Sequence, residues 1–277
     1  MIFHLVGSNP TLSASIEMDF TWQFVHQGIY LWSLIITRIV GMFIFSPLFG
    51  ASIVPATARV GLAFFISVIV YSTLSPYYTI GISTPILSIL ISLMFNFLIG
   101  IIMGFTATLI FMGIQFAGEV YGIQIGFGMV NVMDPQSQTQ ISILSQFSFY
   151  LAMLVFIVVR GDLLLIDALV NSFKVIPPTV SSTSLNFVNV LIEKTGDVFI
   201  VGMEIGFPII MFLLLTSFIL GILSRLVPQM NVFMIGMPLK VALGLIMFLL
   251  LIPFWIDFFT KLFGNMYDSL MQLLVNF

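Results

Sequence analysis

Apolar side chains dominate this chain in long runs that short polar stretches separate. The runs cover residues 29–49, 60–74, 86–117, 141–159, 198–223 and 232–256, with a shorter apolar piece at 163–173 and a helical tail ending at Phe277. A helix of roughly 20 apolar residues is long enough to cross the hydrocarbon core of a bilayer. The pattern therefore predicts an all-α, polytopic hydrophobic protein with about six long helices.

The lengths of these runs do not suit simple membrane spans. The run at 60–74 is brief, the run at 86–117 is too long, and Pro208 lies inside another run. Irregular backbone at membrane depth is tolerated where it packs against protein rather than lipid. We therefore expect broken or re-entrant segments. We also expect close helix contact at Gly100 and Gly104, because small residues at this spacing let helices meet.

Composition supports burial of most of the surface in lipid, in other subunits, or in both. Of 277 residues, 60% are hydrophobic and 7% are charged, whereas an ordinary soluble domain has about 25% charged residues. The net charge of −3 and the scattered Lys and Arg residues do not suit nucleic acid, which needs a clustered basic surface.

The domain organisation is expected to be simple. Residues 1–15 lack the basic start and long apolar core of a signal peptide. Met18 is a more natural beginning of the first helix, so residues 1–17 are predicted to be a weakly ordered extension. No connection is long enough to separate two domains, so residues 18–277 are predicted to form one helical domain.

The sequence offers little for catalysis. It has no cysteine, and His4 and His26 are its only histidines, so a thiol nucleophile is absent and a histidine metal site or triad is nearly excluded. There is no P-loop and no Gly-x-Ser-x-Gly motif, and the GFGMVN stretch at Gly126 lacks the third glycine of a dinucleotide fingerprint. We predict a protein that is not an enzyme and has no catalytic residues, metal or cofactor.

The stretch 118–140, GEVYGIQIGFGMVNVMDPQSQTQ, interrupts the apolar pattern. Gly118, Gly122 and Gly126 recur every four residues and would form one bare face of a helix, while Gly128 and Pro135 disfavour a regular helix beyond them. Backbone is therefore expected to bend or pack closely here. Met129 and Met133 lie in this stretch, and their flexible thioether side chains would suit a deformable seal. Ordinary packing is the more common role of a methionine.

Two charged residues lie inside apolar runs, Arg38 and Glu204. A charge facing lipid is costly, so each is predicted to face protein or a water-filled cavity. The alternatives are an interhelical ion pair or a side chain that reaches the membrane interface.

A polar hairpin is predicted between the last two long runs, at SRLVPQMNVFMIGMPLK. Prolines fix a corner and amides can satisfy freed backbone groups. The residues that carry this pattern are Arg225, Pro228, Gln229, Asn231, Phe233, Gly236, Pro238 and Lys240.

Taken in series, these motifs resemble those of the FliR family of flagellar and type III secretion export-gate proteins. The hairpin pattern is joined upstream by Pro47, Pro55-x-x-x-Arg59, Gly118-Glu119, Gln124-x-Gly126-Phe127, Asp134-Pro135 and Ser172-Phe173 to Pro177. The resemblance runs from about residue 20 to 263 in the family's order and spacing. Residues 1–17 have no counterpart in it, and Gly161-Asp162 stands where a Gly-His pair is expected.

The resemblance implies a core structural and gating subunit of a flagellar type III protein-export gate. Such a subunit packs with FliP and FliQ in a helical multi-subunit assembly around the pore, with FlhB at the entrance and the FlhA ring beneath. Exported flagellar proteins pass through this pore. The implied location is the bacterial inner membrane, multi-pass and in contact with lipid, within the flagellar basal body and partly raised toward the periplasm.

The resemblance also implies roles for individual residues. The central stretch corresponds to the family's pore plug, with 134–140 as the polar cap of the next helix; the plug residues are Gly118, Tyr121, Gly122, Gln124, Gly126, Phe127, Gly128, Met129 and Met133. The hairpin from Arg225 to Lys240 is assigned to contacts with neighbouring subunits.

One alternative comes from a different class of protein. A secondary transporter with discontinuous helices would also explain Arg38, Glu204 and the glycine breaks. The two halves of the chain show no convincing repeat, which counts against it. Positive charges in the connections divide two against four between the two sides and do not settle the topology.

Overall fold

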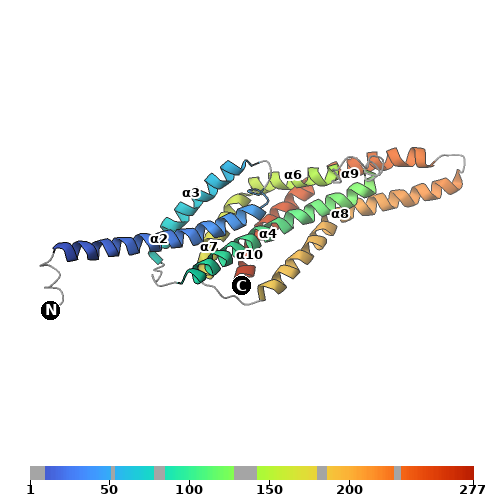
Figure 1. Cartoon of the computed structure of the whole chain (residues 1–277). Helices are drawn as coiled ribbons and strands as arrows, with labels where there is room; N and C mark the ends of the chain where they lie inside the picture. The colour runs from blue at the N-terminus through green and yellow to red at the C-terminus, as the bar shows by residue number, and fades with distance from the viewer. Residues whose placement is uncertain (1–9, 51–53, 78–84, 128–141, 180–185, 228–231) are drawn as a thin grey trace. The chain divides into compact units, whose positions relative to one another are not determined.

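The computed structural model describes residues 10–50, 54–77, 85–127, 142–179, 186–227 and 232–277, and these residues are almost entirely helical (Figure 1). The α-helices are α2 (Pro10–Phe45), α3 (Ala56–Leu74), α4 (Ile86–Ile125), α6 (Ile143–Val158), α7 (Gly161–Val175), α8 (Asn186–Leu226), α9 (Val232–Gly264) and α10 (Met266–Val275). A short 3₁₀ turn, η1 (Ser75–Tyr77), follows α3. The predicted all-α class is confirmed.

The expected membrane-spanning character is also confirmed by the length and hydropathy of the helices. Among the described residues, five helices are long and apolar enough to cross a membrane, or six if α6 and α7 count as one broken span. These two helices meet at an angle of 67°. Arg160, between them, adopts a left-handed φ of 60°, which turns the chain sharply between the two helices. The predicted broken span is therefore α6–α7.

Several helices extend further than the sequence pattern predicted. α4 has 40 residues and continues past Ala117 to Ile125, α8 has 41 residues, and α9 continues to Gly264. At 1.5 Å per residue, α4 is about 60 Å long, roughly twice the thickness of a hydrocarbon core. α2 begins at Pro10, where a proline costs little because the first helical turn needs no intrahelical N–H bond.

By its internal contacts the chain divides into two compact units. Unit 1 contains Met1–Phe105 and Leu169–Ser184, and unit 2 contains Thr106–Ala168 and Leu185–Phe277. The sequence-based prediction of one helical domain from residue 18 onward stays a prediction, because α4 and α7 each contribute residues to both units.

In unit 1, α2 packs against α3 and against the first half of α4. Gly41 and Gly100 lie where the two backbones touch, since a Cβ atom added at either would collide with main-chain atoms of the other helix. Gly104 continues this contact against Met42 and Phe45. The predicted close approach at Gly100 and Gly104 is confirmed, and α2 is the partner helix.

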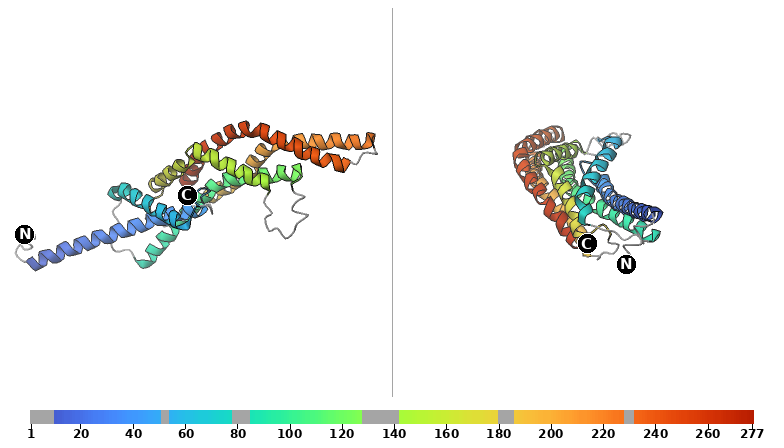
Figure 2. Two further views of the ribbon diagram at one scale, coloured as in Figure 1. Left: turned by 90° about the horizontal axis from the view of Figure 1, so that it is seen from above. Right: turned by 90° about the vertical axis from the view of Figure 1, so that its left-hand side faces the viewer.

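In unit 2, α8 and α9 form a long hairpin, and α6 and α10 pack against it (Figures 1 and 2). Apolar side chains remain abundant on the outside of this hairpin. In the most apolar part of Met234–Val275, 17% of the residues are buried within the chain. Lipid or other protein must therefore cover most of this surface.

Candidate functional site

The end of α4 is fixed against α6 by glycine. A Cβ atom at Gly118 would lie 2.9 Å from the backbone nitrogen of Ser145 and still closer to its Cα atom. One turn later, a Cβ atom at Gly122 would collide with the side chain of Ser142. The Ser145 hydroxyl donates a hydrogen bond across this contact to the Gln115 carbonyl at 2.9 Å. The bare helical face predicted from the glycine spacing therefore exists at Gly118 and Gly122, where the start of α6 packs, whereas Gly126 lies beyond the end of α4.

Tyr121 lies at the centre of an aromatic cluster formed by α4, α6 and α9. Its ring stacks on Trp255 with centroids 5.8 Å apart and contacts Phe248 at the same separation. Its hydroxyl is hydrogen-bonded to Ser148, which itself donates to the Leu144 carbonyl at 2.8 Å, so Tyr121 is the donor. Tyr121, Trp255 and Phe248 are buried. Tyr121 is thus a packing residue that secures the base of the predicted plug.

Gly126 ends α4. Its φ of 120° is accessible to glycine and strained for other residues. The glycine therefore lets the chain leave the helical conformation at this point. The amide of Phe127 still bonds to the Gly122 carbonyl at 3.1 Å. Gln124, Gly126 and Phe127 are half-buried. The other predicted plug residues, Gly128, Met129 and Met133, lie outside the described residues, as does the predicted polar cap at 134–140.

Arg38 forms the most connected polar site in unit 1. Its Nε and Nη2 atoms donate to Asn96 Oδ1 at 3.0 and 2.7 Å, Nη1 donates to Ser172 Oγ at 3.0 Å, and Nη2 also donates to the Ile176 carbonyl at 3.0 Å. The guanidinium lies 4.1 Å above the centre of the Phe173 ring. Arg38 is fully buried, so the prediction that it faces protein is confirmed.

Asn96 was not singled out by sequence reasoning. Its Nδ2 atom donates to the Ser92 carbonyl at 2.7 Å and to the Pro178 carbonyl at 2.8 Å. The sequence feature that could have indicated it is an amide side chain in the middle of an apolar run. Pro178, which follows α7, is buried, and its carbonyl is satisfied by the Asn96 amide.

Glu204 is exposed on α8 in the isolated chain, inside one of the apolar helices. Its neighbour Gly202 is buried, because a Cβ atom there would lie 3.0 Å from the Gly113 carbonyl of α4. α8 thus presents Glu204 on the face opposite to its α4 contact. The prediction that Glu204 faces protein or a water-filled cavity stays a prediction.

The connection between α8 and α9 is shorter than the sequence pattern suggested. α8 includes Arg225, which is exposed, and α9 already begins at Val232. Pro238 and Lys240 are therefore helical, and the prediction of a turn reaching to Lys240 is wrong. The surrounding apolar run favours helix strongly enough to tolerate one missing N–H bond at Pro238.

Of the remaining hairpin residues, two lie in α9 and three lie outside the residues that the structure describes. Phe233 lies in the first turn of α9 and Gly236 is buried one turn later, whereas Pro228, Gln229 and Asn231 lie outside the described residues. No cluster of metal-ligating side chains occurs within the described ranges.

The long apolar helices and the broken span define a multi-pass helical membrane protein. Residues 29–266 match the family model described as "Bacterial export proteins, family 1", and the chain belongs to this family, which is that of the flagellar biosynthetic protein FliR. Fold and family together make it a multi-pass component of the flagellar export apparatus.

The similarity to individual relatives extends over most of both chains. The chain is 33% identical to flagellar biosynthetic protein FliR of Bacillus subtilis, covering 77% of this chain and 83% of the relative. It is 32% identical to FliR of Buchnera aphidicola from Acyrthosiphon pisum, covering 86% and 90%. For Escherichia coli FliR the identity is 29%, covering 89% and 93%.

Proposed function

We propose that this chain is the core structural and gating subunit of a flagellar type III export gate, and that the stretch after Gly118 plugs the secretion pore. FliP and FliQ are the proposed neighbours in the pore assembly, with FlhB and FlhA nearby and unfolded flagellar proteins as the transported substrates. The role is non-enzymatic. The proposed location is the inner membrane, with part of the assembly raised toward the periplasm.

The observation that carries this proposal is the pair of fixed ends around the central stretch. The chain leaves α4 after Ile125 and enters α6 after Ser142, and the Gly122–Ser142 contact joins the ends of these two helices. The two helices that flank the stretch are therefore fixed to each other at the points where it begins and ends. Phe127 with Met129 and Met133 supplies apolar bulk, and thioethers adapt to the surfaces they meet.

The outer surface of the α8–α9 hairpin supports a role within a larger assembly. Large apolar side chains such as Phe218, Leu226 and Leu250 are exposed along it. Both helices are longer than a bilayer is thick. A surface of this kind, together with Glu204, is better covered by neighbouring subunits than by lipid alone.

The plug is tested by deleting residues 127–131 from the full chain in its assembled gate. This deletion spares Tyr121 and Gly122, which belong to the helical packing, so the assembly is expected to form normally. We expect increased ion conductance across the membrane, measured as faster loss of membrane potential in cells. A deletion that includes Tyr121 is expected to damage folding as well and is less informative.

The matched control replaces residues 127–131 by five serines, which keeps the length and removes the apolar bulk. Leakage from the deletion with a smaller effect of the serine variant indicates that the stretch blocks the pore by occupying it. A gate that assembles and stays ion-tight after the deletion contradicts the plug assignment.

The transporter alternative receives less support. Arg38, one of its two charged candidates, is fully buried among hydrogen-bond partners and does not line an open path within unit 1. Co-purification with FliP and FliQ distinguishes the two functions, because a transporter is expected to be stable alone in detergent.

A further inference from the structure

A partly open cavity lies within unit 2, away from the α4–α6 contact. Its volume is about 140 Å³, and it is bounded by α4, by the first third of α8, and by the turn from α9 to α10. A cavity of roughly this size, about 150 Å³, is sufficient for a benzene-sized ligand. Its lining includes the polar residues Lys194, Asp197 and Asn265 and the apolar residues Leu109, Val201 and Leu262.

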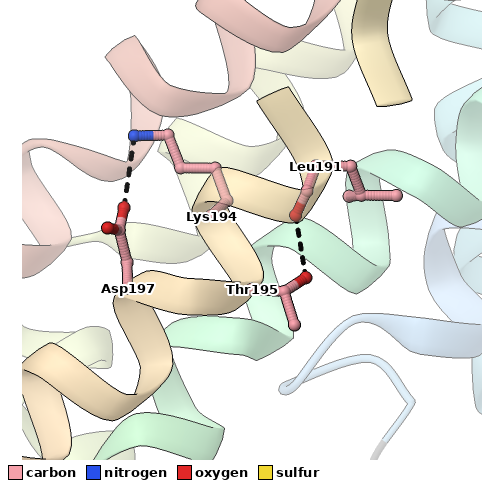
Figure 3. Close-up of polar contacts among 4 residues, drawn as sticks. All are labelled: Leu191, Lys194, Thr195 and Asp197. Carbon is pink, nitrogen blue, oxygen red and sulfur yellow. Dashed lines mark hydrogen bonds and ion pairs between the residues drawn. The ribbon is translucent and has the colours of Figure 1, made fainter. Parts of the chain in front are cut away.

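Lys194 and Asp197 form an ion pair within this cavity, one turn apart on α8 (Figure 3). Their charged atoms are 3.5 Å apart, whereas a good charge-assisted hydrogen bond is about 2.7–2.9 Å long. The Lys194 ammonium carries three N–H donors, so this loose contact leaves most of its bonding capacity unused. The side chains are 19% and 45% exposed, respectively.

Helix stabilisation alone does not account for this pair. A helical Lys–Asp pair adds little to helix stability, and the order with the cation first is the weaker one. Withdrawing a lysine from water costs more than an exposed pair returns. The neighbouring Thr195 hydroxyl is already bonded to the Leu191 carbonyl at 2.8 Å on the other side of the helix, so it does not assist (Figure 3).

The position of the pair along α8 indicates what the cavity accepts. The apolar run of this helix begins at Val198, directly after Asp197, and the cavity lining on α8 continues from there to Ile200 and Val201. Within two turns the cavity therefore passes from a cation and an anion to a hydrocarbon wall. This change from a charged to an apolar lining matches an amphiphile whose polar end carries both a positive and a negative charge.

We propose that this cavity binds a phospholipid with a phosphoethanolamine head group. The phosphate accepts hydrogen bonds from the Lys194 ammonium, the primary ammonium of the lipid donates to the Asp197 carboxylate, and part of an acyl chain lies against Leu109, Val201 and Leu262. The inference rests on the membrane location of the chain and is independent of the plug.

The two charges select against other head groups. A phosphoglycerol head has no cation for Asp197 and offers the carboxylate only neutral hydroxyl donors, which form weaker hydrogen bonds than an ammonium. A choline head carries a cation without N–H donors, so it forms no hydrogen bond with Asp197. Phosphoethanolamine satisfies both side chains, and losing one charge-assisted hydrogen bond is expected to weaken binding by about tenfold.

The test uses the full chain co-purified with its partner subunits, stripped of lipid in detergent and titrated with phosphatidylethanolamine, phosphatidylglycerol or phosphatidylcholine. Native mass spectrometry measures the bound lipid. Phosphatidylethanolamine is expected to bind about tenfold more tightly than the other two. Lys194→Gln and Asp197→Asn are each expected to lower this affinity by about tenfold. Free phosphoethanolamine is expected not to bind, because it lacks the acyl chain.

Lys261→Gln and Asp268→Asn are matched controls, because both residues are exposed on α9 and α10 and neither lines the cavity. Ile200→Trp is a second variant, which fills the cavity from an exposed position without altering charge, and it is expected to abolish lipid binding. Equal binding of phosphatidylglycerol, or unchanged binding by Lys194→Gln, Asp197→Asn and Ile200→Trp, overturns the proposal. Crosslinking of a photoreactive residue at position 269 to another subunit instead of lipid also overturns it.

Discussion

Arg38 and Asn96 are joined by two hydrogen bonds to a single amide oxygen, at 3.0 Å from Nε and 2.7 Å from Nη2. The Nδ2 atom of the same amide donates a hydrogen bond to the Pro178 carbonyl. Through these two side chains, α2, α4 and the segment that follows α7 are connected in unit 1. A buried cation is thus held by neutral groups whose geometry is fixed by three separate parts of the sequence.

Asn96→Leu is expected to destabilise the protein strongly. The change removes two hydrogen bonds from a buried guanidinium and leaves the Pro178 carbonyl without its amide donor, at a cost of about 3 kcal/mol or more. The measurement is the thermal midpoint of the purified assembly in detergent, together with the amount of chain in the membrane. Lys174→Ala is the control, because this lysine is exposed on α7. Wild-type stability of Asn96→Leu would show that the network is not needed for folding.

Gly100→Ala is expected to separate α2 from α4. The added methyl group would lie 2.9 Å from the Met42 amide nitrogen and closer still to the Arg38 carbonyl, so backbone rather than a side chain must move. Overpacking of this kind costs about 1–3 kcal/mol or more. Gly61→Ala, on α3, meets no atom within 4 Å and is expected to be neutral or slightly stabilising. Comparing their thermal midpoints tests the contact, and equal midpoints refute it.

Gly118→Ala is expected to disturb the base of the proposed plug. A methyl group there displaces Ser145 and with it the start of α6, at a cost of about 1–3 kcal/mol. Motility in soft agar and secretion of flagellar proteins are expected to fall, with increased ion leakage. Gly221→Ala, in an open position on α8, provides the control. If both variants export normally, the α4–α6 contact is not required for gating.

Tyr121→Phe removes the hydrogen bond to Ser148 and keeps the stacking of the ring on Trp255. The ring still packs on Trp255, and Ser148 keeps its bond to the Leu144 carbonyl, so the expected cost is about 1 kcal/mol. Tyr121→Ala removes the ring and is expected to cost about 3–5 kcal/mol. Thermal unfolding followed by tryptophan fluorescence measures both. Similar losses for the two variants would assign the stability to the hydroxyl instead of the aromatic cluster.

Replacing Arg225 and Lys240 together by alanine is expected to weaken association with FliP and FliQ. Arg225 is exposed near the end of α8 and Lys240 is half-buried on α9, so their removal leaves most of the chain's own packing intact. Co-purification through an affinity tag measures the association. Lys261→Ala is the control from the far end of α9. Full recovery of both partners by the double variant argues against a contact role for this hairpin.

Much of the fold was determined by local properties of the sequence. The runs of apolar residues specified the helices and the all-α class, and the glycines at 118 and 122 specified a bare face, because side-chain periodicity on a helix is fixed by its geometry. Gly126 ends α4 near the predicted break, since its backbone conformation is accessible to glycine.

Other features depended on partners distant in sequence. That α4 reaches Ile125 and that Tyr121 is a packing residue follow from contacts with α6 and α9, which local propensity does not contain.

The central stretch shows both sources of information together. Local residue types predicted a break in the helical pattern after Gly118, because glycine permits unusual backbone conformations and proline removes an N–H donor. Long-range packing sets the point where the helix ends: Gly118 and Gly122 stay helical because the start of α6 fills the space that their missing side chains leave. The same holds for Arg38, whose burial was predictable from its cost in lipid, whereas its hydrogen bond to Asn96 required α4 to pack beside α2.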